Sequence, residues 1–276
     1  MSAIVESRTQ RELQDVTYEV DDGVAWITIA RPERYNAFRA QTIDELIHCF
    51  KLAWAAPDVG VAVLTGTGEK AFCAGGDQKQ RAETGDYGFS DYGLFEIEQL
   101  HRLIRAIPKP VIAAVNGVAI GGGHVLHVLA DITIAAEHAR FGQNGPRVGS
   151  FDAGFGTSYL ARVVGEKRAR EIWFLCRQYS AEQAERWGLV NTVVPLSELR
   201  AEVRRWADEM LALSPTALRF LKQSFNADSE HIGGVASVAF TGLHQFTASP
   251  EAAEGTAAFA AKRTPDFTPF RADASF

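Results

Sequence analysis

Short apolar runs alternate with helical patterns along the first half of the chain. Residues 61–64, 111–115 and 132–136 are too short for ordinary helices and are flanked by glycine, proline or aspartate, as buried strands are. Helical patterns separate them at residues 95–107 and after Gly121. Because strands that alternate with helices normally pair side by side in one direction, this order predicts an α/β fold with a largely parallel sheet.

The chain divides into three expected parts. Residues 1–14 form an N-terminal arm, residues 15–200 the α/β core, and residues 201–276 a helical region. The core opens with a hairpin of residues 16–20 and 24–29, joined by Asp21-Asp22-Gly23. Later helices are expected to start where a serine can cap orphan backbone N–H groups. These serines are Ser180, Ser214 and Ser249.

Composition places the chain among globular proteins. Its 276 residues are 46% hydrophobic and 22% charged. With 28 Lys and Arg against 34 Asp and Glu, the net charge is −6, so binding to nucleic acid is not expected. Cys49, Cys73 and Cys176 are too scattered for a disulfide framework, and there is no apolar run of membrane-spanning length. These features predict a cytoplasmic protein without a membrane partner.

Several motifs give weak signals. Residues 66–71 match a dinucleotide fingerprint in spacing, but Phe72 and the residues after it interrupt the helix that such a site needs. His124, His127 and Asp131 have metal-ligand spacing, yet they lie in apolar sequence where packed histidines are more common. We therefore expect no metal site and no tightly bound cofactor.

Two glycine clusters are more informative. Gly75-Gly76 follows the third predicted strand, and Gly121-Gly122-Gly123 precedes a helix. Glycine leaves its backbone N–H uncovered, so one N–H from each cluster could bind a developing oxyanion. The alternative is that both clusters only form tight turns.

The ordered motifs resemble the crotonase (enoyl-CoA hydratase/isomerase) superfamily over residues 16–267. The motifs are Arg31-Pro32, Asn36-Ala37-Phe38, residues 71–77, Lys109-Pro110, Gly117, residues 121–123 and Phe141-Gly142-Gln143. The resemblance implies a crotonase-like spiral of ββα units and a C-terminal helical trimerisation region that builds trimers or hexamers. It also implies an acyl-CoA substrate whose thioester oxygen binds the N–H groups of Gly76 and Gly122.

Two substitutions argue against simple hydration. Where the hydratases carry glutamates, this chain has Val125 and Gly145. The stretch from Gln143 to Asp152 resembles a narrower branch that contains 2-ketocyclohexanecarboxyl-CoA hydrolase and 1,4-dihydroxy-2-naphthoyl-CoA synthase. In that branch the residues matching Ser150 and Asp152 lie at the reacting carbons.

Local resemblances point both ways between ring opening and ring closing. Residues 35–39, 44–47 and 98–101 are closer to the hydrolase, while residues 79–81, 86–88 and 123–127 are closer to the synthase. The C-terminal active-site tyrosine of these relatives aligns with Thr247. The loss of this phenol suggests a different ring substrate.

We therefore expect hydrolytic ring cleavage of an alicyclic β-oxoacyl-CoA. The alternatives are Dieckmann-type ring closure and a non-catalytic acyl-CoA-binding or RNA-binding relative. The expected catalytic groups are Asp152, Ser150, Gly76 and Gly122. The expected substrate and CoA contacts are Arg39, Ala74, Gly75, Asp77, Gln78, Tyr87, Gly121, Gln143, Asn144, Gly145, Thr247 and Lys262. Arg39 and Lys262 are candidates for the CoA phosphates, and a bicarbonate ion could fill the space left by Gly145.

Overall fold

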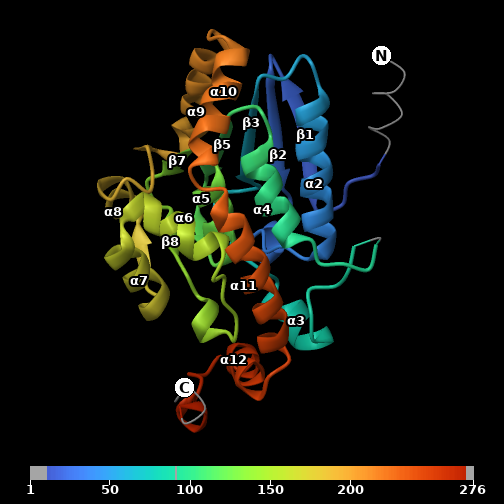
Figure 1. The fold of residues 1–276 in the computed structure, drawn as a ribbon, viewed down its shortest axis with the longest axis vertical. Coiled ribbons are helices and arrows are strands. Elements are labelled where there is room, and N and C mark those ends of the chain that lie inside the picture. Colours follow the sequence, from blue (N-terminus) through green and yellow to red (C-terminus); the bar gives the residue numbers. More distant parts are fainter. Residues whose placement is uncertain (1–10, 91, 272–276) are drawn as a thin grey trace.

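The computed structural model describes residues 11–90 and 92–271 (Figure 1). The strands are β1 (Val16–Asp21), β2 (Val24–Ile29), β3 (Val61–Gly66), β4 (Ala71–Cys73), β5 (Val111–Val115), β6 (Val118–Ile120), β7 (Ile132–Ala136), β8 (Arg140–Gly142), β9 (Gln178–Ser180) and β10 (Thr192–Val194). The helices are α2 (Ala40–Ala55), α3 (Gln78–Thr84), α4 (Ile97–Ala106), α5 (Gly122–Leu129), α6 (Phe155–Val164), α7 (Glu166–Leu175), α8 (Ala181–Arg186), α9 (Leu196–Leu211), α10 (Pro215–Ala227), α11 (His231–Thr247) and α12 (Pro250–Ala260).

The strands form two sheets. The larger has the order β1-β2-β3-β5-β7-β10 and is parallel except for the β1–β2 hairpin. The smaller has the order β4-β6-β8-β9, with only β9 antiparallel. From β3 to β8, successive strands go to the two sheets in turn, and helices follow the second strand of each pair. This is the α/β spiral of ββα units that the resemblance implied.

The larger sheet is buried on both faces. Side chains at alternate positions of β3 point to opposite faces. Ala62 and Leu64 pack with α2 and α4, whereas Val61 and Val63 pack with Leu199, Val203 and Ala207 of α9. The boundary expected at residue 200 therefore falls inside α9, which covers the outer face of the sheet.

Of the helices after α9, α10 lies beside the larger sheet, whereas α11 and α12 extend away from it (Figure 1). Helix α11 contacts α4 and α6, and α12 contacts α3 and α11, so this region packs on the half of the core that carries the glycine clusters. Several large apolar side chains on α10 and α11 are exposed. They are Phe220, Leu221, Phe225, Val235 and Val238. Self-association through them stays a prediction.

The N-terminal arm is described only from Arg11 onward, and residues 1–10 lie outside the described residues. The described end of the arm is tied to α2. The guanidinium of Arg11 bonds the carboxylate of Asp44 at 2.5 Å, and Glu45 accepts the backbone N–H groups of Asp15 and Val16 at 2.8 and 3.0 Å.

Among the described residues, no helix is long and apolar enough to cross a membrane. The same residues contain no group of three His, Cys, Asp or Glu side chains placed to hold a metal ion. Asp131 instead accepts from Lys222 Nζ at 2.6 Å and from the N–H of Val111 at 2.8 Å. Residues 66–71 run from the end of β3 into β4 rather than into a helix, so they do not form a dinucleotide site.

Candidate active site

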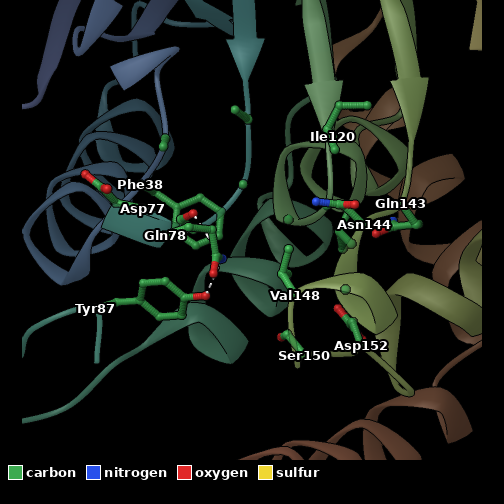
Figure 2. Close-up of a pocket in the computed structure, with 18 of the residues that line it drawn as sticks. Phe38, Asp77, Gln78, Tyr87, Ile120, Gln143, Asn144, Val148, Ser150 and Asp152 are labelled. Atoms are coloured by element: carbon green, nitrogen blue, oxygen red, sulfur yellow. Dashed lines mark hydrogen bonds between the residues drawn. The ribbon is translucent and has the colours of Figure 1, made fainter. Parts of the chain in front are cut away.

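A cavity of about 490 Å³ opens between the two glycine clusters and the segment after β8. We call its first side, residues 74–78 with 120–122, the oxyanion wall. We call its second side, residues 143–152, the acid–base wall. In Figure 2, Gln78 and Tyr87 lie on one side of the cavity and Ser150 and Asp152 on the other.

The oxyanion wall is built from backbone. Phe38 pairs with Gly76 as an isolated parallel bridge, which uses the carbonyl of Gly75 and the N–H of Asp77. In such a bridge the N–H of the central residue, Gly76, points away from the pairing strand. Gly122 is the first residue of α5, so its N–H has no acceptor within the helix. Both N–H groups are therefore available at the cavity.

Close packing requires glycine in this wall. A Cβ on Gly75 would lie 3.0 Å from the backbone nitrogen of Gly122, so the two clusters meet. A Cβ on Gly76 would lie 2.6 Å from Cζ of Tyr87, and one on Gly122 would collide with the ring of Phe38. Tight turns alone do not require this convergence.

Asp77 supports the wall rather than facing a ligand freely. Its carboxylate accepts from Arg31 Nη2 at 2.9 Å and caps α3 through the N–H groups of Lys79 and Gln80. The side chain of Gln78 donates to the hydroxyl of Tyr87 at 2.8 Å (Figure 2). This bond holds the phenol of Tyr87 beside Gly76.

The acid–base wall is a loop whose shape depends on three contacts. The carbonyl of Gly145 accepts the N–H of Ser150 at 2.9 Å and closes the turn. The guanidinium of Arg81 donates to the carbonyls of Val148 and Gly149 at 3.2 and 2.9 Å. Gly149 also packs against Ala252 of α12 so closely that a Cβ would overlap the helix backbone.

Position 145 lacks the hydratase glutamate and also lacks the space for a larger side chain. A Cβ at this position would lie 2.7 Å from the carbonyl oxygen of Ser150. A glutamate here therefore cannot be added without moving the loop that carries Ser150 and Asp152. Val125, at the other hydratase position, is buried at the cavity wall.

Asp152 is held at the bottom of the acid–base wall. Its Oδ1 accepts the N–H of Gly154 at 3.0 Å. Burial raises the pKa of this carboxyl, while the N–H groups of Gly156 and Gly154 oppose that rise and the charge of Glu98 adds to it. A carboxylate with a raised pKa is a stronger base than one on the surface.

His101, which was not among the residues expected from the sequence, also lines the cavity. It follows Leu100 on the buried face of α4, and its Nδ1 lies 3.9 Å from Oδ2 of Asp152. Burial alone lowers the pKa of His101 to about 3. The available signal was a histidine within the apolar stripe of a helix, which usually means packing and so gave no warning of a site.

Most expected site residues meet at the cavity. Those that line it are Asp152, Ser150, Gly76, Gly122, Ala74, Gly75, Asp77, Gln78, Tyr87, Gly121, Gln143, Asn144 and Gly145.

Three expected contacts lie elsewhere in the structure. Arg39 forms a bidentate pair with Asp15, the residue just before β1, at 2.8 and 3.0 Å. The hydroxyl of Thr247 bonds the carbonyl of His244 on its own helix, and Lys262 is exposed beyond α12. None of the three lines this cavity in the described chain.

Comparisons with known proteins agree with this geometry. The Enoyl-CoA hydratase/isomerase family model matches residues 19–269, so the chain belongs to that family and is an enzyme of the crotonase superfamily. An enoyl-CoA hydratase from Mycobacterium avium subsp. paratuberculosis is 30% identical over 93% of this chain and 100% of its own, with a TM-score of 0.82. A carnitinyl-CoA hydratase from Mycobacterium avium is 30% identical over 93% and 99%, with a TM-score of 0.81.

Proposed function

We propose that this enzyme hydrolyses a carbon–carbon bond in the ring of an alicyclic β-oxoacyl-CoA. The product is an open-chain CoA thioester with a terminal carboxylate. One observation carries the proposal: Asp152 is the single acidic residue deep in the described cavity that has no cationic partner. The other two acidic residues of the lining are Glu33, which is exposed, and Asp77, which is paired with Arg31. Val125 stands at a position where the hydratases carry a glutamate.

The first half of the reaction uses the acid–base wall. Asp152 removes one proton from a water molecule, and the hydroxide adds to the ring ketone. Ser150 lines the cavity beside Asp152 and orients this water. When the tetrahedral adduct collapses, the bond between the former ketone carbon and the α-carbon breaks. The ketone carbon leaves as a carboxylic acid.

The second half uses the oxyanion wall. The electron pair of the broken bond becomes a thioester enolate, whose oxygen accepts the N–H groups of Gly76 and Gly122. One well-placed donor of this kind contributes about 3 to 4 kcal/mol to transition-state stabilisation. Protonated Asp152 then returns its proton to the α-carbon and regenerates the carboxylate.

The lining of the cavity suits a neutral ring at the deep end and a charged group at the open end. Phe95, Val125, Trp173 and other apolar side chains surround the reacting groups. Arg34 and Lys79 line the more exposed part. We assign these two cations, in place of Arg39 and Lys262, to the CoA phosphates.

The named activities of the similar structures are hydrations, so hydration is the main competitor. Adding water to an enoyl thioester needs acid–base groups on both sides of the double bond. Among the described residues, the deep part of this cavity holds one carboxylate without a cationic partner, Asp152, and the turn at Gly145 leaves no space for a second. The same enolate chemistry run backwards is ring closure, which the phenol of Tyr87 beside Gly76 favours as a second candidate.

Product analysis tests the proposal. The enzyme is incubated separately with a panel of cyclic β-oxoacyl-CoA thioesters, with crotonyl-CoA and with an open-chain aromatic diacid thioester. The masses of the products are measured by mass spectrometry. We expect a gain of one water from a cyclic substrate. Hydration of crotonyl-CoA at an ordinary enzyme rate would overturn the proposal, loss of water from the diacid thioester would support ring closure, and binding without turnover would support the non-catalytic alternative.

A further inference from the structure

His101 is a buried side chain whose ring is packed but whose polar atoms form no hydrogen bond in the described structure. It is 2% exposed, and neither ring nitrogen has a hydrogen-bond partner among the described residues. A buried polar group left unpaired has lost its hydrogen bonds to water without gaining others, which is unfavourable for folding. Phe155 and Phe240 pack against the ring, with centroid distances of 5.6 and 5.9 Å. A leucine or phenylalanine would fill the same space without that cost.

The unpaired imidazole faces the one unpaired carboxylate of the deep cavity. Nδ1 of His101 lies 3.9 Å from Oδ2 of Asp152, about 1 Å beyond hydrogen-bond distance. The other oxygen, Oδ1, is fixed by the N–H of Gly154, so rotation of the carboxylate about that anchor can close the gap. Hydrogen bonds between catalytic groups are often long in unliganded enzymes and shorten when substrate binds.

We propose that His101 is the positioning residue for Asp152: its Nδ1–H donates to Oδ2 and turns the remaining carboxylate lone pairs toward the attacking water. The role in catalysis rests on the function proposed above. The imidazole stays neutral throughout, because burial opposes its charge. The imidazole moves no proton in the reaction. The hydrogen bond keeps His101 in the tautomer with its hydrogen on Nδ1, and it holds the carboxylate of Asp152 in one orientation.

This hydrogen bond also sets the basicity of Asp152. A donor to the ionised form lowers a carboxyl pKa, and here it would offset part of the rise caused by burial. The other charged group facing Asp152 is Glu98 on α4, which is ion-paired with Arg102 at 2.6 Å and whose charge adds to the rise in the pKa of Asp152. Trp173 on α7 and Phe240 on α11 are the neighbouring cavity-lining groups, and both are uncharged. His101 is therefore the group whose removal should change the titration of Asp152 most.

The test measures that titration without any substrate. Infrared difference spectra against pH follow the protonated carboxyl band of Asp152, which is assigned by its loss in Asp152→Asn. In His101→Phe, which keeps an aromatic ring but removes the donor, we expect the midpoint to rise by about one pH unit. In His101→Asn, whose amide can donate near the same position, we expect most of the rise to be reversed. An unchanged midpoint in His101→Phe would overturn the proposal.

Kinetics on a cleaved cyclic thioester supply the second readout. We expect kcat of His101→Phe to fall about 30-fold with KM within about twofold, and its acid limb to move to higher pH with the Asp152 midpoint. His127→Phe is the matched control, because His127 is equally buried but does not line the cavity. Equal kcat in His101→Phe and wild type would also overturn the role. If the wild type cleaves no member of the panel, the proposed function fails, and the infrared titration still decides whether His101 bonds Asp152.

Discussion

The two walls of the cavity are built by different means. The oxyanion wall presents backbone N–H groups, and its shape is fixed by the Phe38 bridge and by glycines in direct contact. The acid–base wall presents side chains from a loop, and its shape depends on Arg81, on the Gly145 turn and on α12. The first wall is a property of the fold, whereas the second depends on a few side chains.

This difference explains why membership of the family does not by itself fix the reaction of this chain. Stabilising a thioester enolate needs only N–H groups in the right place, which any sequence that closes the same backbone supplies. Whether an enzyme of this fold adds water to a double bond or cleaves a carbon–carbon bond depends on where its acid–base side chains lie. A loop can change those groups without changing the sheets, so the fold identifies the family and the loop decides the reaction.

Removing the base should have the largest effect and should leave the oxyanion wall intact. We expect Asp152→Asn to fold and to bind acyl-CoA, but to lower kcat for ring cleavage about 1,000-fold, because a positioned acid–base group contributes about 10² to 10⁴. Steady-state kinetics with calorimetric binding of the substrate check this. Near wild-type kcat in the folded variant would remove Asp152 from the mechanism.

Damaging the oxyanion wall should give the next largest effect. In Gly122→Ala the new Cβ meets the ring of Phe38, so the N–H of residue 122 must move. We expect kcat to fall about 100-fold, the cost of losing one oxyanion donor. The control is Gly234→Ala, because a Cβ there meets nothing within 4 Å. A Gly122→Ala enzyme as active as the control would show that this N–H does not bind the enolate.

A smaller change at the acid–base wall tests the Gly145 turn. In Gly145→Ala the Cβ lies against the carbonyl of Ser150, so we expect kcat for ring cleavage to fall about tenfold as the loop shifts. For the same reason, Val125→Glu with Gly145→Glu should lose ring cleavage and gain at most weak hydration of crotonyl-CoA. Product mass and thermal unfolding are measured together. Hydration by the double variant at an ordinary enzyme rate would show that the turn accepts a glutamate.

The smallest expected effect lies at the open end of the cavity, away from both walls. We expect Arg34→Ala to raise KM about fivefold with kcat unchanged, because a phosphate contact far from the reacting atoms contributes equally to ground and transition states. Arg39→Ala is the contrasting variant, since Arg39 is engaged by Asp15. Its KM should stay at the wild-type value, and a rise equal to that of Arg34→Ala would return Arg39 to the CoA site.

Much of the fold could be predicted because its signals are local. The strands β2, β5 and β7 were predicted at their observed bounds, and the hairpin at Asp21-Asp22-Gly23 is confirmed. Serine caps also marked helices correctly: Ser180, Ser214 and Ser249 each accept a backbone N–H at the start of α8, α10 and α12. Helix α2 begins at Ala40 without a serine cap, and the hydroxyl of Thr42 in its first turn accepts the N–H of Arg39 and donates to Asp15.

The second sheet could not be predicted from periodicity. Its strands are three residues long, too short for an alternating pattern to emerge, and they pair only because the larger sheet brings β4, β6 and β8 together. The placement of long charged side chains was equally hidden. Arg39 was expected to bind a phosphate, but it pairs with Asp15, 24 residues earlier in the chain. This could not be predicted, because nothing in the sequence shows which carboxylate a guanidinium binds.

What the sequence by itself determined is the set of backbone requirements: buried strands, capped helices and glycines where two loops approach each other. These depend on residues close in the chain, or on a residue type that only one geometry tolerates. What only the tertiary structure decided is which side chains share the cavity. His101 on α4 and Asp152 on a loop some 50 residues later face each other at 3.9 Å. That meeting depends on how α4 and α6 pack across the core, because contacts between distant segments carry no period and no local signal.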